Sequence, residues 1–296
     1  MKCRIINNNK IELLNTCAFD TLVQLFACAT TDSIQFGNYI FDDNKSGLFY
    51  ELLRCITKNG VTNKVYDLRT NILYHIFPHD ELLRSIVRVG CHCDIREIMI
   101  NKVLNDVIMA DEIHRCSNDQ CQRIMKKVPV KCIPYSSRSE DFGDLQVHID
   151  DLIKPSSTLC AGFNNCEGIW TIETVLKSHV LIEVSNIPED KLFYKDAKIG
   201  EENLLDVSEA VFGDVVCSLE SIPIKITIMN EHFILRGAAV FIGNRSAART
   251  GIGHYVAVAL RNDGHWEDYD DFKHKPVSIP KSTECGVQIL LYTRET

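Results

Sequence analysis

Apolar residues in the first two-fifths of the chain recur at the spacing of amphipathic helices. Behind Asn15 and Thr16, four apolar residues occupy positions i, i+3, i+4 and i+7 of one helix face: Leu22, Leu25, Phe26 and Ala29. Asn and Thr are good N-cap types, so this pattern predicts a helix that starts at or beside Cys17. Further helices are predicted at residues 47–57, 71–76, 81–89 and 95–107.

From about residue 111 the pattern changes to short β-branched runs that are separated by turn-forming residues. Several of these runs alternate apolar and polar positions with period two, which is typical of half-buried antiparallel strands. The predicted strands cover residues 128–135, 144–149, 168–175, 179–187, 222–229, 232–243, 255–261 and 287–293. The pattern therefore predicts an α+β protein in which a helix-rich lobe precedes a strand-rich one.

The length and the charge of the chain narrow the class of protein. At 296 residues it forms one large domain or two small ones, and 45% hydrophobic with 24% charged residues is an ordinary globular composition. Lys and Arg number 32 against 40 Asp and Glu, a net charge of −8, which is the opposite of the basic footprint of a nucleic-acid binder. No apolar run is long enough to span a membrane and the start lacks a signal peptide, so we expect an intracellular protein without a membrane partner.

The thirteen cysteines need an explanation other than disulfides. Their number is odd, and without an export signal the thiols are expected to stay reduced. Free cysteine packs as a small apolar residue. Five cysteines with apolar neighbours are therefore predicted to lie in the core: Cys3, Cys28, Cys55, Cys217 and Cys285.

Two segments at opposite ends of the chain together carry the chemistry of a thiol hydrolase. The first is Asn-Thr-Cys-Ala-Phe-Asp around Cys17; the second is Gly-His-Tyr-Val-Ala around His254, followed by Trp-Glu-Asp-Tyr-Asp-Asp at 266–271. A cysteine at a helix start is favoured as the thiolate, which is the nucleophilic form. A histidine can take the thiol proton and return it to a leaving amine, while a carboxylate fixes the histidine tautomer. Each residue alone is commonly structural, but their joint occurrence favours catalysis.

These segments resemble the Cys box and the His box of the ubiquitin-specific proteases. A closing strand, Val-Gln-Ile-Leu-Leu-Tyr, extends the resemblance, which spans residues 15–294. It implies a single catalytic domain over residues 1–296 with a papain-like α+β cysteine-protease fold. The helical thumb is expected at about residues 1–110, and the β-rich palm with reduced fingers at about 111–296.

Position by position, the resemblance makes Cys17 the nucleophile, His254 the general base and acid, and Asp270 the residue that orients His254. Asp271 becomes a supporting carboxylate. Between the histidine and these carboxylates, Asn-Asp-Gly at 262–264 predicts a hairpin turn, which would bring the side chains to one side of the sheet.

Glu12 is a departure from the pattern of the family. The family commonly has an asparagine at this position, five residues before the nucleophile, where its amide stabilises the oxyanion; an ionised glutamate cannot donate a hydrogen bond. Asn15, the backbone N–H of Cys17, or one of the asparagines at 7–9 would then have to serve.

Asp20 stands where the family has another asparagine. Cys-x-x-Asp, together with Tyr-Asp-Asp at 269–271 and Ile-Pro-Ile at 222–224, is more similar to the branch of the family that cleaves SUMO. The glycine-rich segment at 243–253 leads directly into His254, and it is either a loop that folds over a substrate tail or a plain hairpin loop.

Four further cysteines are candidates for a structural zinc site. Cys116 and Cys121 are separated by four residues, and Cys160 and Cys166 by five, against two to four in common zinc sites. A hairpin could bring the two pairs together around one tetrahedral ion, at the place where the family has its fingers. The alternative is that the four thiols are unligated. Catalysis by Cys17 needs no cofactor.

The resemblance implies hydrolysis of the bond after the C-terminal Gly-Gly of ubiquitin or a ubiquitin-like modifier, through an acyl-enzyme on Cys17. The alternatives are a SUMO-specific isopeptidase, a module that binds the modifier without cleaving it, and a cysteine protease that processes an unrelated protein in a viral or mobile-element setting. The expected partners are the modifier and its conjugates.

Overall fold

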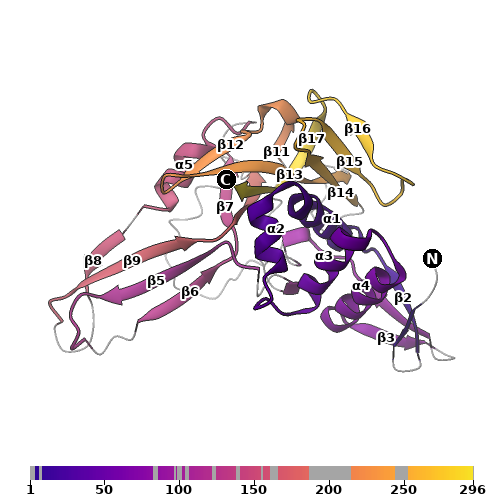
Figure 1. The fold of residues 1–296 in the computed structure, drawn as a ribbon, viewed down its shortest axis with the longest axis horizontal. Helices are drawn as coiled ribbons and strands as arrows, with labels where there is room; N and C mark the ends of the chain where they lie inside the picture. Colours follow the sequence, from indigo (N-terminus) through magenta and orange to yellow (C-terminus); the bar gives the residue numbers. More distant parts are fainter. Residues whose placement is uncertain are drawn as a thin grey trace, which may run out of the picture.

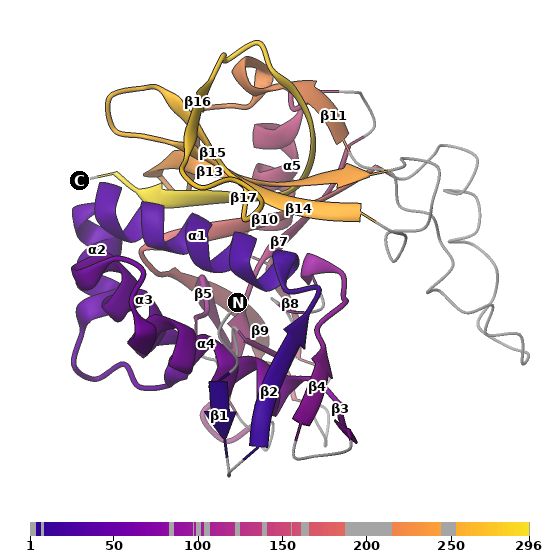
Figure 2. The same ribbon diagram turned by 90° about the vertical axis from the view of Figure 1, so that its right-hand side faces the viewer.

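A central helix, α1 (Cys17–Asp32), lies against one face of a large sheet, and three shorter helices pack on its other side (Figures 1 and 2). These are α2 (Ile34–Phe41), α3 (Leu48–Asn59) and α4 (Asn63–Ile76). The computed structural model describes residues 4–6, 9–82, 86–96, 98, 102–103, 107–121, 125–137, 141–154, 156–160, 166–186, 215–243 and 253–295.

Helix α1 is central because apolar side chains cover most of its circumference. Phe19, Leu22, Leu25 and Phe26 are each 0% exposed, since they are enclosed between the sheet and the other helices. The helix begins at Cys17, as predicted. Because the rest of the helix is packed in the core, its first turn, which carries Cys17, is held in a fixed position.

Within the described part of the chain, nine strands form the large sheet. Its main path runs β16-β15-β14-β13-β17-β10-β7, while β11 pairs with β17 and β12 pairs with β13. The bounds are β7 (Ile133–Ser137), β10 (His179–Asn186), β11 (Val215–Ser218), β12 (Lys225–Ile228), β13 (Glu231–Gly243), β14 (Gly253–Leu260), β15 (Trp266–Tyr269), β16 (Val277–Ile279) and β17 (Glu284–Arg294).

Both faces of this sheet carry apolar side chains, because alternate residues of each central strand point to opposite faces. On β14, Tyr255 and Ala257 belong to the core that contains α1. Val256 and Val258 belong to a second core, which is closed by α5 (Leu145–Leu152). The sheet is thus the shared wall of two cores.

Two four-stranded sheets lie away from the large one. Beside the helices are β1 (Arg4–Ile6), β2 (Asn9–Leu14), β4 (Ile86–Gly90) and β3 (His79–Leu82), in that spatial order. The other sheet extends away from the helices, at the left of Figure 1. In spatial order, it consists of β6 (Lys126–Val130), β5 (Ala110–Cys116), β9 (Ile169–Leu176) and β8 (Ser156–Leu159).

Two sequence-based element assignments are wrong. The pattern predicts a helix over residues 81–89, but residues 81–82 belong to β3 and residues 86–89 to β4, where Val87 and Val89 are buried with the period of a strand; residues 83–85 lie outside the described residues. Residues 144–149 were expected to be a strand but belong to α5, where Leu145 and Ile149, four positions apart, face the core. In windows this short, the apolar pattern fits both periods. The helix expected at 95–107 lies largely outside the described residues.

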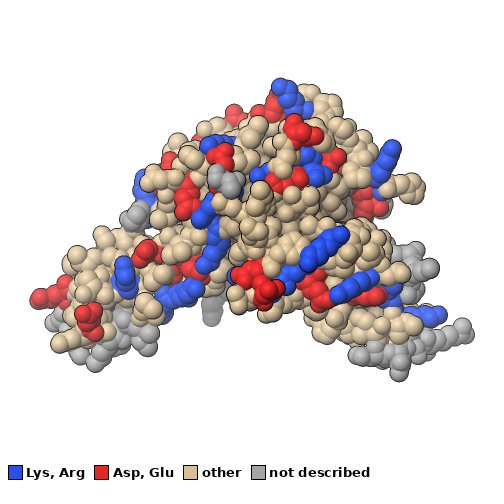
Figure 3. Space-filling view, in the orientation of Figure 1, with Lys and Arg blue, Asp and Glu red and all other residues tan. Residues whose placement is uncertain are grey.

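The remaining predictions of strands and helices agree with elements of the structure, and the mixed α and β class is confirmed. Cys28, Cys55, Cys217 and Cys285 are buried, as predicted, whereas Cys3 lies outside the described residues. Among the helices that the structure describes, none is long and apolar enough to cross a membrane. On the face drawn in Figure 3, acidic and basic side chains are interspersed, so charge is balanced locally there.

Candidate active site

Cys17 is the first residue of α1 and is half-buried. Asn15, which precedes it, has a left-handed backbone with φ of 56°, so the chain turns sharply from β2 into the helix. Thr16 is the N-cap residue, but its side chain makes no hydrogen bond to the helix backbone. The thiol therefore lies at a helix start, where the free N–H groups and the helix dipole favour negative charge.

His254 lies near the start of β14, and the hairpin to β15 brings two carboxylates to its ring. The register pairs Leu260 with Trp266 across the predicted turn, which confirms the hairpin. His254 Nε2 lies 2.9 Å from Asp270 Oδ1 and 3.3 Å from Asp271 Oδ1. The arrangement can hold the imidazole in one orientation.

Two further contacts fix the His254 ring and Asp270. The Phe272 ring stacks on the imidazole, with the centroids 4.3 Å apart. The Phe272 backbone N–H donates to Asp270 Oδ1 over 3.0 Å. Although burial raises the pKa of Asp270, this N–H and His254 lower it below its ordinary value. For Asp271 burial dominates, so that its pKa is raised.

The thiol of Cys17 lies beside β14, near the backbone N–H of Tyr255, the residue after His254. Burial raises the pKa of Cys17; the N–H groups of Tyr255 and Ala18 lower it, and the charge of Asp271 raises it, with a net shift upward. Among the described residues, no hydrogen bond joins Cys17 to His254. The thiol, the imidazole and the two carboxylates thus lie in one site. In this structure the thiol and the imidazole are not hydrogen-bonded to each other.

A groove of about 680 Å³, lined at one end by Cys17, Asp270 and Asp271, follows α1. Its floor includes residues from every turn of α1 between Cys17 and Thr31. Its wall includes the segment 269–271, which carries Asp270. An extended peptide can therefore reach the thiol. Of the segment 243–253, only Gly243 and Gly253 lie among the described residues, so its predicted contact with a substrate stays a prediction.

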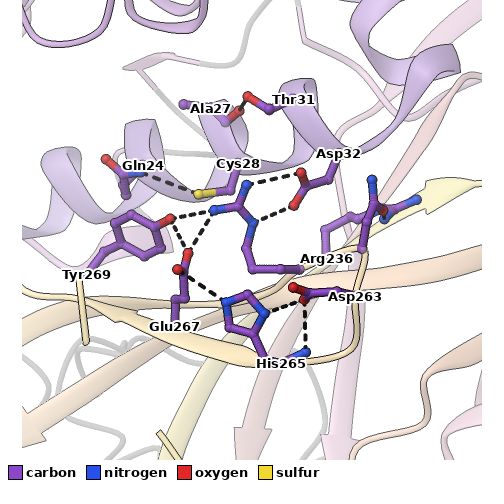
Figure 4. A network of polar contacts seen from close by, with 12 residues as sticks. Gln24, Ala27, Cys28, Thr31, Asp32, Arg236, Asp263, His265, Glu267 and Tyr269 are labelled. Atoms are coloured by element: carbon purple, nitrogen blue, oxygen red, sulfur yellow. Dashed lines mark hydrogen bonds and ion pairs between the residues drawn. The ribbon is translucent and has the colours of Figure 1, made fainter. Parts of the chain in front are cut away.

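Arg261 ties α1 to the hairpin that precedes Asp270. Figure 4 labels its partners Asp32, Glu267 and Tyr269. Its guanidinium contacts both oxygens of Asp32, at 2.6 and 3.1 Å. It also donates to Glu267 and to the Tyr269 hydroxyl, each over 2.7 Å. Tyr269 in turn donates to Glu267 over 2.6 Å. This Arg261 network joins the end of α1 to β15, one residue before Asp270.

The candidates for stabilising the oxyanion can be compared by their distance from Cys17. Glu12 on β2 is only partly exposed and pairs with Arg88 at 2.9 Å, so it does not act as a donor. Asn9 begins β2, and the strand places it about 16 Å from the end next to Cys17, so its candidacy is wrong. Residues 7 and 8 lie outside the described residues. Asn15 and the Cys17 backbone N–H remain beside the thiol.

The four candidate metal-binding cysteines lie together at the end of the sheet that extends from the body of the molecule. All four sulfur atoms are within 4.8 Å of one another. Cys116 Sγ lies 3.7 Å from Cys166 Sγ, and Cys121 Sγ lies 3.7 Å from Cys160 Sγ. Sulfurs bound tetrahedrally to zinc at about 2.3 Å are about 3.8 Å apart. The predicted cysteine cluster can therefore hold a zinc ion.

Backbone N–H groups support this cysteine cluster. Asn118 N donates to Cys116 Sγ over 3.4 Å, and the N–H of Gly168 donates to Cys166, lowering the pKa of that thiol to about 7. Each donor lies two residues after its cysteine. A Cβ atom on Gly168 would lie 2.5 Å from Cys116 Sγ, so only glycine fits there.

Arg69 is the residue of the site that sequence reasoning missed. It lies on α4, its side chain is 9% exposed, and it contacts Asp20 at the start of α1. The two residues are 49 positions apart, so no local pattern links them. The only available signal was Asp20 itself, a charged residue in a position where the family has a neutral one.

Comparisons with known proteins support a fold and no closer identity. No protein-family model matches the chain. The 120.7 kDa protein in the NOF-FB transposable element of Drosophila melanogaster is 25% identical over 304 residues, a match that covers 98% of this chain and 26% of that protein. The chain thus spans about a quarter of the length of this curated relative.

Solved structures of the SAGA DUB module are similar in fold. One Ubp8/Sgf11/Sus1/Sgf73 module with altered Ubp8 and Sgf11 covers 97% of this chain and 68% of that chain, at 14% identity and a TM-score of 0.50. A further Ubp8-Sgf11-Sgf73-Sus1 module covers 97% and 67%, at 13% identity and a TM-score of 0.43. The first likeness supports a fold like that of the ubiquitin-specific proteases, and at this identity it concerns the fold alone.

Proposed function

We propose that the chain is a cysteine-dependent isopeptidase that hydrolyses the bond after the C-terminal Gly-Gly of ubiquitin or a ubiquitin-like modifier. The observation that carries the proposal is the His254–Asp270 contact of 2.9 Å beside a thiol at a helix start. The likeness of the fold to a DUB module supports a modifier as the substrate. In this proposal the helical lobe is the thumb, the large sheet the palm, and the sheet with the cysteine cluster the fingers.

The reaction follows from the roles of three side chains. His254 takes the proton of Cys17, and the thiolate attacks the carbonyl carbon of the C-terminal glycine of the modifier. The tetrahedral intermediate collapses when His254 returns the proton to the leaving lysine amine, which leaves a thioester on Cys17. Water then attacks the thioester, with His254 as base, and releases the modifier carboxylate and the thiol. Asp270 holds the imidazole in the tautomer that each step needs.

The oxyanion of each intermediate requires hydrogen-bond donors near the thiol. The backbone N–H of Cys17, at the first position of α1, has no acceptor within the helix, and Asn15 lies in the left-handed turn just before it. Because Glu12 is paired with Arg88, these two groups are the donors that we propose.

The choice of modifier is a separate question. Asp20 favours the SUMO-cleaving variant of the proposal, because it departs from the ubiquitin-specific pattern in that direction. The relative in a transposable element favours a third variant, a protease that processes a protein of a mobile element. All three variants use the same acyl-enzyme chemistry and differ in what reaches the groove.

A second candidate function is a module that binds the modifier without cleaving it. Two observations favour it: Glu12 occupies the position of the usual oxyanion amide, and no hydrogen bond joins Cys17 to His254 among the described residues. Against it stands the complete set of thiol, imidazole and carboxylate.

A panel of activity probes distinguishes these functions. Ubiquitin, SUMO and other modifiers that carry a C-terminal electrophile are incubated with the wild type, Cys17→Ala and the control Cys132→Ala, whose half-buried thiol lies outside the groove. We expect one modifier class to label the wild type and the control but not Cys17→Ala. Equal labelling of Cys17→Ala would refute the nucleophile. Tight binding of a modifier with no labelling would instead establish the non-catalytic module.

A further inference from the structure

A buried polar network lies directly behind the start of α1. Arg69 Nε donates to Asp20 Oδ1 over 2.6 Å, and its Nη2 donates to Asp20 Oδ2 over 2.5 Å. The same Nη2 donates to Thr16 Oγ1 over 2.5 Å, while that hydroxyl donates to Asp20 Oδ2 over 2.7 Å. Arg69 and Thr16 are each 8% exposed. Nε and Nη2 of Arg69, the Thr16 hydroxyl and both carboxylate oxygens of Asp20 are therefore paired with one another.

This network replaces the ordinary cap of α1. The side chain of the N-cap residue Thr16 usually accepts a hydrogen bond from the helix backbone, but here it is turned towards Arg69 and Asp20. Arg69 lies on α4, so its guanidinium fastens the first turn of α1 to a second helix. Cys17 directly follows Thr16 and is the first residue of that turn, so its position depends on this attachment.

Asp20 places a negative charge near the thiol, three residues after Cys17 on the same helix. Its charge raises the pKa of Cys17 and also that of Asp271. Taken alone, this charge would oppose formation of a thiolate. Arg69 compensates it through a two-point contact that a lysine cannot reproduce. Among the described residues, the titratable and charged groups that act on the thiol, on Arg69 or on Asp271 are Asp20, Tyr66, Arg69, Cys91, His254, Asp270 and Asp271.

We infer that Arg69 is a positioning residue for Cys17: it fastens the start of α1 and balances the charge of Asp20 beside the thiol. The inference rests on the proposed function in that it assigns Cys17 a nucleophilic role. It also explains why an aspartate is tolerated where the family has an asparagine, since the additional charge has a buried partner of opposite sign.

The test measures the thiol itself and needs no modifier. The full chain is alkylated with iodoacetamide over a range of pH, and the rate at Cys17 is followed by mass spectrometry of its peptide. We expect Arg69→Gln to move the midpoint of the profile upward by about one pH unit, because Asp20 loses its compensating charge. Asp20→Asn should move it downward, and the double variant should return towards the wild type.

Two variants separate positioning from a general effect on folding. Arg88→Gln removes an exposed arginine that pairs with Glu12 and should leave the midpoint unchanged. Arg69→Lys keeps the charge and should shift the midpoint less than Arg69→Gln. If the glutamine variant does not fold, Asp20→Asn decides the test, because it removes the charge that Arg69 balances. A wild-type midpoint in Asp20→Asn, or in a folded Arg69→Gln, would overturn the inference. A failed probe panel would contradict the proposed function without altering this result.

Discussion

Asp268 and Asp270 are two positions apart at the end of β15, and their carboxylates meet different partners. Asp268 is buried on the face of the sheet away from α1; Lys273 contacts its Oδ2, and its Oδ1 has no hydrogen-bond partner among the described residues. Asp270 lies one residue past the strand end and reaches His254 at 2.9 Å. Alternation along a strand would place both on one face, so it is the end of the strand that lets Asp270 turn towards the imidazole.

We predict that Asp270→Ala lowers turnover by about a thousandfold or more, because the imidazole loses its tautomer and its orientation. Asp271→Ala should have an intermediate effect, since its Oδ1 lies 3.3 Å from His254 Nε2. Asp268→Ala should have a small one. The three variants are compared on one fluorogenic modifier substrate. An Asp268→Ala enzyme that is slower than Asp270→Ala would overturn the choice of Asp270.

The sequence predicts those features of the site that depend on residues close together in the chain. The helix start at Cys17 follows from cap types and apolar spacing, and the hairpin between His254 and Asp270 follows from two alternating runs around an Asn-Asp-Gly turn. Residue type and position in the order of elements predict the four cysteines of the cluster, and their sulfur atoms lie within 4.8 Å of one another.

Contacts between distant segments were beyond that reasoning. Asp32 and Arg261 are 229 positions apart, and Arg69 and Asp20 are 49 apart, and no periodicity encodes such pairs. The wrong assignments at 81–89 and 144–149 have a related cause. In short apolar windows the neighbouring elements select the conformation, as β2 does when it pairs in parallel with β4.

Glu267 should make the stability of the protein depend on pH. Burial raises its pKa, but Tyr269, Arg261 and His265 donate to the carboxylate and lower the pKa from 4.5 to about 2. Because the folded value is below the unfolded one, the stabilisation is present above about pH 4.5 and is lost as the pH falls towards 2. We expect Glu267→Gln to lower the free energy of unfolding by about 1 to 3 kcal/mol at pH 7.

Urea unfolding at pH 7 and at pH 3 measures this effect, and the difference between the wild type and Glu267→Gln should shrink at the lower pH. Glu284→Gln is the matched control, because the Glu284 side chain is exposed and makes no hydrogen bond or ion pair among the described residues. A difference between the wild type and Glu267→Gln that is equal at both pH values would show that the carboxylate charge does not stabilise the Arg261 network.

The zinc site gives the last prediction, and a glycine tests it without touching a ligand. Purified protein should contain about one zinc per chain, and Cys116→Ser should lose the metal and melt at a lower temperature, because structural zinc binding contributes directly to folding. Gly168→Ala should do the same, since its Cβ would lie 2.5 Å from Cys116 Sγ. Gly90→Ala is the control: its Cβ would meet no atom within 4 Å. Zinc content by mass spectrometry and melting temperature are measured for each protein, with and without a chelator. Wild-type protein that is free of metal and melts at the same temperature as Cys116→Ser would show that the four thiols are unligated.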